Sequence, residues 1–125
     1  MPKRVMHNDE MPAALGPYSQ AVGAFGELVF ISGQAGLDAN GGIPDGFDGQ
    51  ARNAFDNLAR VVEACGLSMA DVVKTTIYLA DASHFPALNA LFAEYFPNNP
   101  PTRAVPIVQL PKGLLISIEA VAVRP

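Results

Sequence analysis

The segment LLISIEAVAV, Leu114 to Val123, constrains the fold of this 125-residue chain more than any other part of it. Every residue in the segment except Glu119 is apolar or small, which is typical of a largely buried strand. Side chains alternate between the two faces of a strand. The more uniformly apolar face, which should meet helices, carries Ile116, Ile118, Ala120 and Ala122, whereas the other face carries Leu115, Ser117, Glu119, Val121 and Val123.

Two segments have the apolar spacing of amphipathic helices. The first is expected to run from about Gly49 to Cys65, with Gly66 as its C-terminal stop. The second is expected over 83–96, with Ser83 as a cap, Pro86 in the first turn and Pro97 as the end. Helical spacing in the second segment groups Phe85, Leu88, Phe92 and Tyr95, which we interpret as packing residues.

Four further segments are predicted to be strands, and the first fifteen residues are predicted to form a loose arm. The four strand segments are 18–22, 27–35, 72–80 and 103–110. SMAD, residues 68–71, resembles a capping box that could start a single turn. The order β-β-α-β-α-β-β predicts an α+β fold in which two helices pack on one mixed sheet of about five to six strands, and the chain length fits a single domain over 1–125.

Composition narrows the classes of function. The net charge of −4 and the scattered basic residues weigh against nucleic-acid binding, which depends on Lys and Arg. The chain has one cysteine, Cys65, and no apolar segment typical of a signal peptide or a membrane span, so we expect a cytoplasmic protein. His7, His84 and Cys65 lack the spacing of metal ligands, and no phosphate-binding or dinucleotide-binding fingerprint is found. Half of the residues are hydrophobic, and a partner subunit could cover the surplus apolar surface.

Glu119 has two interpretations on sequence alone. Its face of the strand could be the solvent face, where the carboxylate only adds solubility. Alternatively, another subunit covers that face, and the carboxylate lies in a partly dry cleft. It would then need a neighbouring cation or would take up a proton, and either outcome suits acid–base chemistry. Arg103, after the prolines of NPPTRAVP, is either a surface arginine at a strand entrance or a guanidinium that binds a substrate carboxylate.

Six short motifs occur in an order that resembles a known family. They are GPYSQ at 16–20, ISGQ at 31–34, VVKTTIYLAD at 72–81, PTR ending at Arg103, LPK at 110–112 and ISIEAVAV at 116–123. Together they are similar to the RidA/YjgF reactive-intermediate deaminases, also labelled the L-PSP endoribonuclease family. The resemblance covers nearly the whole chain. It implies a chorismate-mutase-like α+β fold, a homotrimer with its sheets around a central barrel, active clefts between subunits, and no cofactor.

The resemblance also implies an activity, the hydrolysis of 2-imino acids such as 2-iminopropanoate and 2-iminobutanoate to 2-oxo acids and ammonia. It assigns the substrate carboxylate to Arg103 and the handling of water to Glu119. The remaining positions that it implies are Tyr18 at the pocket border, Ser32 and Gly33 near the imine, Asn89 in support, and the backbone amide of Val105. Two positions depart from the family pattern. Many family members carry a cysteine where Val105 stands, and Pro106 beside it lacks an N–H, so the resemblance defines the preferred substrate less closely than the fold.

Two other functions are open. One is a non-enzymatic trimer that binds small carboxylates or holds unfolded clients in the same cleft. The other is RNA cleavage, which one family label suggests and which the acidic balance of the chain disfavours.

Overall fold

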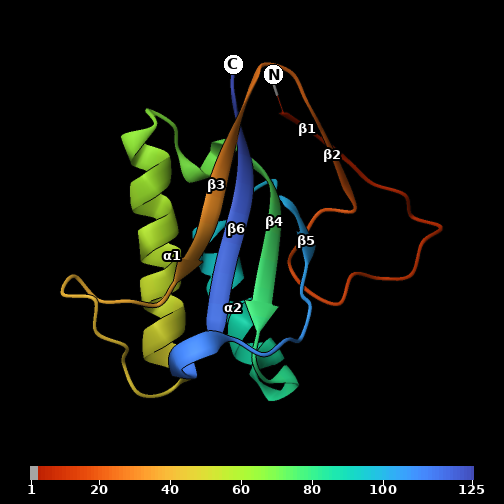
Figure 1. Cartoon of the computed structure of the whole chain (residues 1–125). Coiled ribbons are helices and arrows are strands. Elements are labelled where there is room, and N and C mark those ends of the chain that lie inside the picture. The colour runs from red at the N-terminus through yellow and green to blue at the C-terminus, as the bar shows by residue number, and fades with distance from the viewer. Residues whose placement is uncertain (1–2) are drawn as a thin grey trace.

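A computed structural model describes residues 3–125 and shows a twisted four-stranded sheet (Figure 1). Its order is β3-β6-β4-β5. The strands are β3 (Glu27–Ala35), β6 (Ile116–Arg124), β4 (Val72–Leu79) and β5 (Thr102–Ala104). β6 is antiparallel to β3 and β4, whereas β4 and β5 are parallel, so the sheet is mixed as predicted.

Two α-helices, α1 (Phe47–Ala64) and α2 (Phe85–Tyr95), lie on the same face of this sheet (Figure 1). Between them and the sheet lies a core with fully buried Phe55, Leu58, Phe92, Ile116 and Ile118. Burying each such side chain stabilises the fold by about 1.5–3 kcal/mol. The predicted α+β class is therefore confirmed, and so are the two faces of β6, because Ile116, Ile118, Ala120 and Ala122 are the core residues.

Two local predictions around α1 are also confirmed. Gly66, just beyond the helix, has φ +76°, a conformation that glycine adopts without strain. Ser68 and Asp71 form the capping box of η1 (Met69–Asp71), a single turn that leads into β4. The helix begins two residues earlier than expected, at Phe47. The residue before it, Gly46, has φ +82°, which lies outside the helical range.

The N-terminal region differs from the prediction. Residues of the expected loose arm form β1 (Lys3–Met6), which pairs with β2 (Ala21–Ala24) in a separate two-stranded sheet. The strand expected over 18–22 thus begins only at Ala21. Tyr18 N–H donates to the Gly16 carbonyl at 2.9 Å and Ser19 N–H to the Pro101 carbonyl at 3.2 Å, so neither amide is available for strand pairing. The six strands are therefore divided between two sheets and do not form one sheet of five or six.

The strand predicted over 103–110 is also much shorter in the structure. β5 ends at Ala104, and in the described segment 105–110 only Ile107 makes a further bridge, to Leu79. Pro106 has no N–H to donate, and its carbonyl accepts from Leu79 N–H at 3.1 Å. The chain then turns through η3 (Pro111–Gly113) into β6.

The connection into α2 contains a short 3₁₀ turn, η2 (Ala82–His84). Ser83 was expected to cap the helix, but within residues 3–125 no side chain caps α2, whose N-cap residue is His84. Asp81 instead caps η2, where its carboxylate accepts from Ser83 N–H at 2.8 Å. His84, which we expected on the surface, is half-buried and stacks on Phe47 with ring centroids 4.3 Å apart. Within residues 3–125, neither α-helix has the length and apolar character that crossing a membrane requires.

Candidate functional site

Arg103 lies in β5 and points to the helix side of the sheet. It is in register with Thr75, whose side chain is fully buried. The guanidinium carbon lies 5.0 Å from the ring centroid of Tyr18, 5.0 Å from that of Phe92 and 5.3 Å from that of Phe85. Cation–π attraction to three rings holds the charge at this place. Burial lowers the pKa of Arg103 below its ordinary value, although an arginine remains protonated near neutral pH.

Asn89 of α2 and the Gly16 turn complete the surroundings of this arginine. A Cβ atom at Gly16 would overlap both Arg103 Nη2 and Asn89 Oδ1, so the glycine lets the chain approach both groups closely. Asn89 Nδ2 donates to the Leu15 carbonyl at 3.2 Å, and the Tyr18 hydroxyl accepts from Leu15 N–H at 3.2 Å. We call Gly16, Tyr18, Asn89 and Arg103 the arginine cluster.

Two polar atoms in the arginine cluster lack a hydrogen-bond partner within residues 3–125. They are Arg103 Nη1, a donor, and Asn89 Oδ1, an acceptor, and both are buried. A buried donor or acceptor without a partner costs about 1–3 kcal/mol. The cluster therefore has one donor and one acceptor that a small polar ligand could satisfy.

Glu119 occupies the opposite face of the sheet. It is in register with Thr76, one residue beyond the Thr75 that faces the helices, and Oε1 accepts from the Tyr78 hydroxyl at 2.7 Å. This hydrogen bond raises the pKa of Tyr78 above its ordinary value, since loss of the phenol proton would place two negative charges together. The half-buried carboxylate borders a cavity of about 330 Å³ that Phe30, Lys74, Thr76 and Val121 also line.

Ser32 and Gly33 lie in a bulge of β3 where its pairing with β6 shifts register between Ile31 and Gln34. Both residues are exposed, and a Cβ atom at Gly33 would lie 2.8 Å from the Ser117 hydroxyl. Bulges interrupt strand pairing and redirect backbone groups. Since Ser117 and Glu119 share one face of β6, the bulge borders the Glu119 side of the sheet.

The predicted site residues thus fall into two groups within one chain. Arg103, Tyr18 and Asn89 come together on the helix side, and Val105 follows on the same segment, half-buried against the core. Glu119 lies on the other side, close to the Ser32–Gly33 bulge. β4 separates the strands that carry Arg103 and Glu119, so a single chain does not bring these two residues face to face.

Sequence reasoning did not assign Tyr78, Phe85 or Phe92 to the site. The two phenylalanines were interpreted as packing residues, which they are, but their faces also contact the guanidinium. They are seven residues apart, which is typical of residues on one packed face of a helix, and this spacing does not indicate that the cation of Arg103 lies against both rings. Tyr78 had a signal in retrospect, since alternation along the predicted strand 72–80 places it two residues from Thr76 on the same face.

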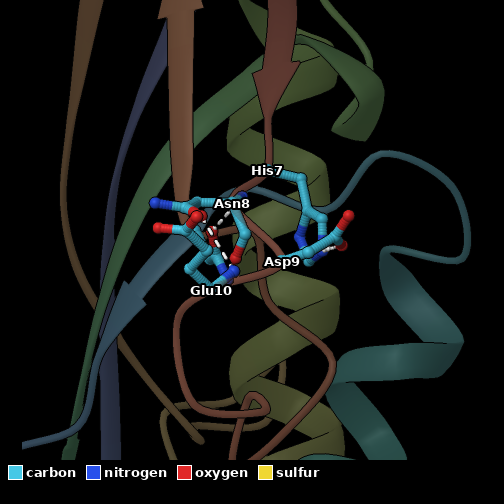
Figure 2. Close-up of polar contacts among 5 residues, drawn as sticks. His7, Asn8, Asp9 and Glu10 are labelled. Atoms are coloured by element: carbon cyan, nitrogen blue, oxygen red, sulfur yellow. Dashed lines mark hydrogen bonds and ion pairs between the residues drawn. The ribbon is translucent and has the colours of Figure 1, made fainter.

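A second polar group lies in the N-terminal segment after β1 (Figure 2). His7 Nε2 is 2.8 Å from Asp9 Oδ1, and both side chains are exposed. Asn8 N–H donates to Gln20 Oε1 at 2.7 Å, which ties this segment to the chain just before β2. The segment borders a cavity of about 420 Å³ that Tyr18 also lines. Over residues 3–125, no group of three or more His, Cys, Asp or Glu side chains is placed to hold a metal ion.

The fold and the site together define a class of protein: an α+β domain with a half-buried arginine at one sheet edge and a half-buried glutamate on the uncovered face of the sheet. The family model described as Endoribonuclease L-PSP matches residues 8–124, and the chain belongs to this family. The predicted resemblance to RidA/YjgF proteins is thereby confirmed.

Among curated relatives, the human 2-iminobutanoate/2-iminopropanoate deaminase is 40% identical over 125 residues, covering 98% of this chain and 90% of the human protein. Among solved structures, RidA from the Antarctic bacterium Psychrobacter sp. PAMC 21119 is 40% identical, with a TM-score of 0.76 over 97% of this chain and 99% of that one. E. coli TdcF with bound serine is 35% identical, with a TM-score of 0.75 and 98% and 99% of the two chains covered.

Proposed function

We propose that this protein hydrolyses small 2-imino acids to 2-oxo acids and ammonia. The names of the human, rat and mouse relatives, each 40% identical, support an imine deaminase. The observation that carries the proposal is the environment of Arg103, a guanidinium held between three aromatic rings with one buried nitrogen unpartnered within residues 3–125.

A carboxylate is the ligand that suits such a guanidinium, because two parallel N–H···O bonds match its planar geometry. Asn89 Oδ1, the neighbouring acceptor, could receive an N–H of the imine, and Tyr18 would border the bound substrate. The serine bound to E. coli TdcF, a relative of the same fold, is also a small molecule with a carboxylate and a nitrogen on the adjacent carbon.

Glu119 is the proposed base. Its carboxylate takes a proton from water while the water oxygen bonds to the imine carbon. The proton then passes to the nitrogen, which gives a carbinolamine. Glu119 next moves the proton of the new hydroxyl group to the same nitrogen, the C–N bond breaks as the C=O bond forms, and ammonia and the 2-oxo acid leave. Backbone groups of Ser32, Gly33 and Val105 are proposed to border the reacting carbon, and no cofactor takes part in the proposed steps.

This chemistry needs both groups in one cleft, and we propose that a homotrimer supplies it. Arg103 of one subunit would then face Glu119 of the partner subunit. The exposed apolar residues beside Glu119 support a covered face: Leu28 is 55% exposed and Phe30 is 74% exposed, both on β3. Large side chains of this kind on an open sheet face commonly mark an interface.

The test is ammonia release from 2-iminopropanoate or 2-iminobutanoate generated in situ. R103A is expected to lower kcat/KM by about 10- to 100-fold, the effect of losing a charged hydrogen-bond pair. E119Q is expected to lower kcat by about 100-fold or more, the contribution typical of a general base. R60A removes another arginine, which is exposed and whose hydrogen-bond partner within residues 3–125 is Asn57, and should leave the rates unchanged. Equal rates for the wild type and R103A would contradict the proposal.

RNA cleavage, which the name of the family suggests, is the alternative enzymatic outcome. The net charge of −4 offers little attraction for phosphates, and we therefore rank it below imine hydrolysis. Saturable binding of small carboxylates without ammonia release would instead indicate a binding module.

A further inference from the structure

The Tyr78 hydroxyl of β4 donates a hydrogen bond to the Glu119 carboxylate of the neighbouring strand β6. Tyr78 is in register with Ser117, so Glu119 is its diagonal neighbour on the adjacent strand, β6. Diagonal cross-strand neighbours are about 7–8 Å apart at Cα, which an aromatic and a long side chain together can span. The resulting Oη–Oε1 distance of 2.7 Å is typical of an O–H···O hydrogen bond.

The contact leaves the second oxygen of the carboxylate available. Within residues 3–125, Tyr78 is the hydrogen-bond partner of Glu119, and the bond uses Oε1 alone. Lys74, which lines the same cavity, directs its ammonium to the Thr76 hydroxyl at 3.0 Å. The carboxylate is thus oriented by a neutral donor and not by a cation.

We propose that Tyr78 is a positioning residue for Glu119: its hydroxyl holds one carboxylate oxygen so that the other faces the water that attacks the imine. The inference rests on the proposed function and deepens it. A neutral donor suits this task, because an ammonium in the same place would stabilise the ionised carboxylate more strongly and weaken it as a base. The raised pKa of Tyr78 keeps its hydroxyl protonated, and so a donor, well into the alkaline range.

Y78F tests the inference, since phenylalanine retains the ring and removes the donor. We expect kcat to fall about tenfold, corresponding to one charge-assisted hydrogen bond, while KM changes less than about twofold because substrate binding rests on Arg103. Y95F is the matched control: it removes a hydroxyl that bonds a different carboxylate, Asp56, on the helix side of the sheet. Its kinetic constants should equal those of the wild type.

The double variant Y78F/E119Q separates positioning from packing. If Tyr78 acts through Glu119, Y78F should cause less than about a twofold further loss in the E119Q background, because residues acting as one unit are not additive. Equal losses in both backgrounds would overturn the inference. The inference would also be overturned if Y78F were fully active while E119Q were inactive. That result would not contradict the proposed function, because Glu119 would still be required.

A titration of phenolate absorbance provides a readout that does not depend on turnover. The component attributed to Tyr78, identified by its loss in Y78F, should move to lower pH in E119Q when the carboxylate partner is removed. An unchanged titration would overturn the contact itself. If the wild type releases no ammonia from any imine, the proposed function fails together with the catalytic part of the inference, and the titration still decides whether Tyr78 holds Glu119.

Discussion

At the scale of single residues, Arg103 is the side chain whose environment most needs an explanation. It is half-buried, and no carboxylate within residues 3–125 forms an ion pair with it. Aromatic rings contribute about 0.5–2 kcal/mol to holding a cation, whereas full desolvation of an ion costs several kcal/mol, and a half-buried guanidinium incurs part of that cost. The remaining cost is offset if a substrate carboxylate binds there, which is why the arginine cluster has more weight in our proposal than any other feature.

Gly16 permits this arrangement, and G16A tests it. A methyl group at this position would overlap Arg103 Nη2 and Asn89 Oδ1, both of which are ends of flexible side chains that can move aside. The fold should therefore tolerate the change, while the guanidinium shifts away from its aromatic neighbours. We expect KM for 2-iminopropanoate to rise about tenfold, equivalent to about 1.4 kcal/mol, with little change in Tm.

Steady-state kinetics and a thermal melt of G16A check this prediction together. G42A is a control, because the atoms nearest to its methyl group would be those of the Asp38 carboxylate, in the loop before α1. A G16A protein with an unchanged KM would show that the position of the guanidinium does not matter to substrate binding.

At the scale of elements, the sequence predicted those parts whose side-chain pattern is periodic. The alternation of β6, the apolar stripe of α1 and the β-branched run of β4 are local signals of burial, and each element lies where it was expected to within a few residues. β1 and the short β5 were missed because their limits are set by tertiary partners. Pairing with β2 creates β1, and Pro106 with the Leu79 bridge ends β5.

Of the candidate site, the face of the sheet that carries Glu119 was predictable from the sequence, whereas the face that carries Arg103 was not. Glu119 stood out as the one carboxylate in an apolar strand, and alternation placed it on the face away from the helices, as observed. Within one chain, the register of β5 with Thr75 directs the guanidinium of Arg103 to the helix side, so any meeting with Glu119 has to occur between subunits. That direction depends on parallel pairing between distant segments, which no local pattern encodes.

The entry into α2 gives a prediction about pH. The backbone N–H of Ser83 donates to Asp81 and holds the pKa of that carboxyl below its ordinary value of 3.8. The depressed pKa means that the ionised group stabilises the folded state above pH 3.8 and that this contribution is lost as pH falls through the lower, folded-state pKa. D81N should therefore have a lower Tm than the wild type near neutral pH, and the difference should shrink in strong acid.

Thermal melts of the wild type and D81N across a pH series measure this directly. D45N changes an exposed aspartate in the loop before α1 and should follow the wild-type curve throughout. A D81N deficit that is the same at every pH would mean that the charge of Asp81 does not stabilise the turn.

At the scale of the whole molecule, the two faces of the sheet differ in what covers them. The helices cover one face, whereas the other, facing the viewer in Figure 1, carries the Glu119 cavity together with exposed Leu28 and Phe30. Half of the residues are hydrophobic, and part of this apolar surface lies exposed beside Glu119, the proposed base. Covering this face with a neighbouring subunit would bury the apolar surface and exclude water around Glu119, and both effects favour the same assembly.

F30E tests that assembly, because Phe30 is 74% exposed in the single chain and in register with Val121 beside the cavity. If the face is solvated, a glutamate there costs little. If a neighbouring subunit covers it, the new carboxylate would be buried without a partner, at a cost of several kcal/mol. We expect sedimentation to show a trimer for the wild type and a smaller species for F30E, with ammonia release lost in parallel. F25E, which changes an 86% exposed phenylalanine between β2 and β3, is the control that should remain assembled. A monomeric wild type with full activity would require Arg103 and Glu119 to act without meeting, and the two-group site would have to be abandoned.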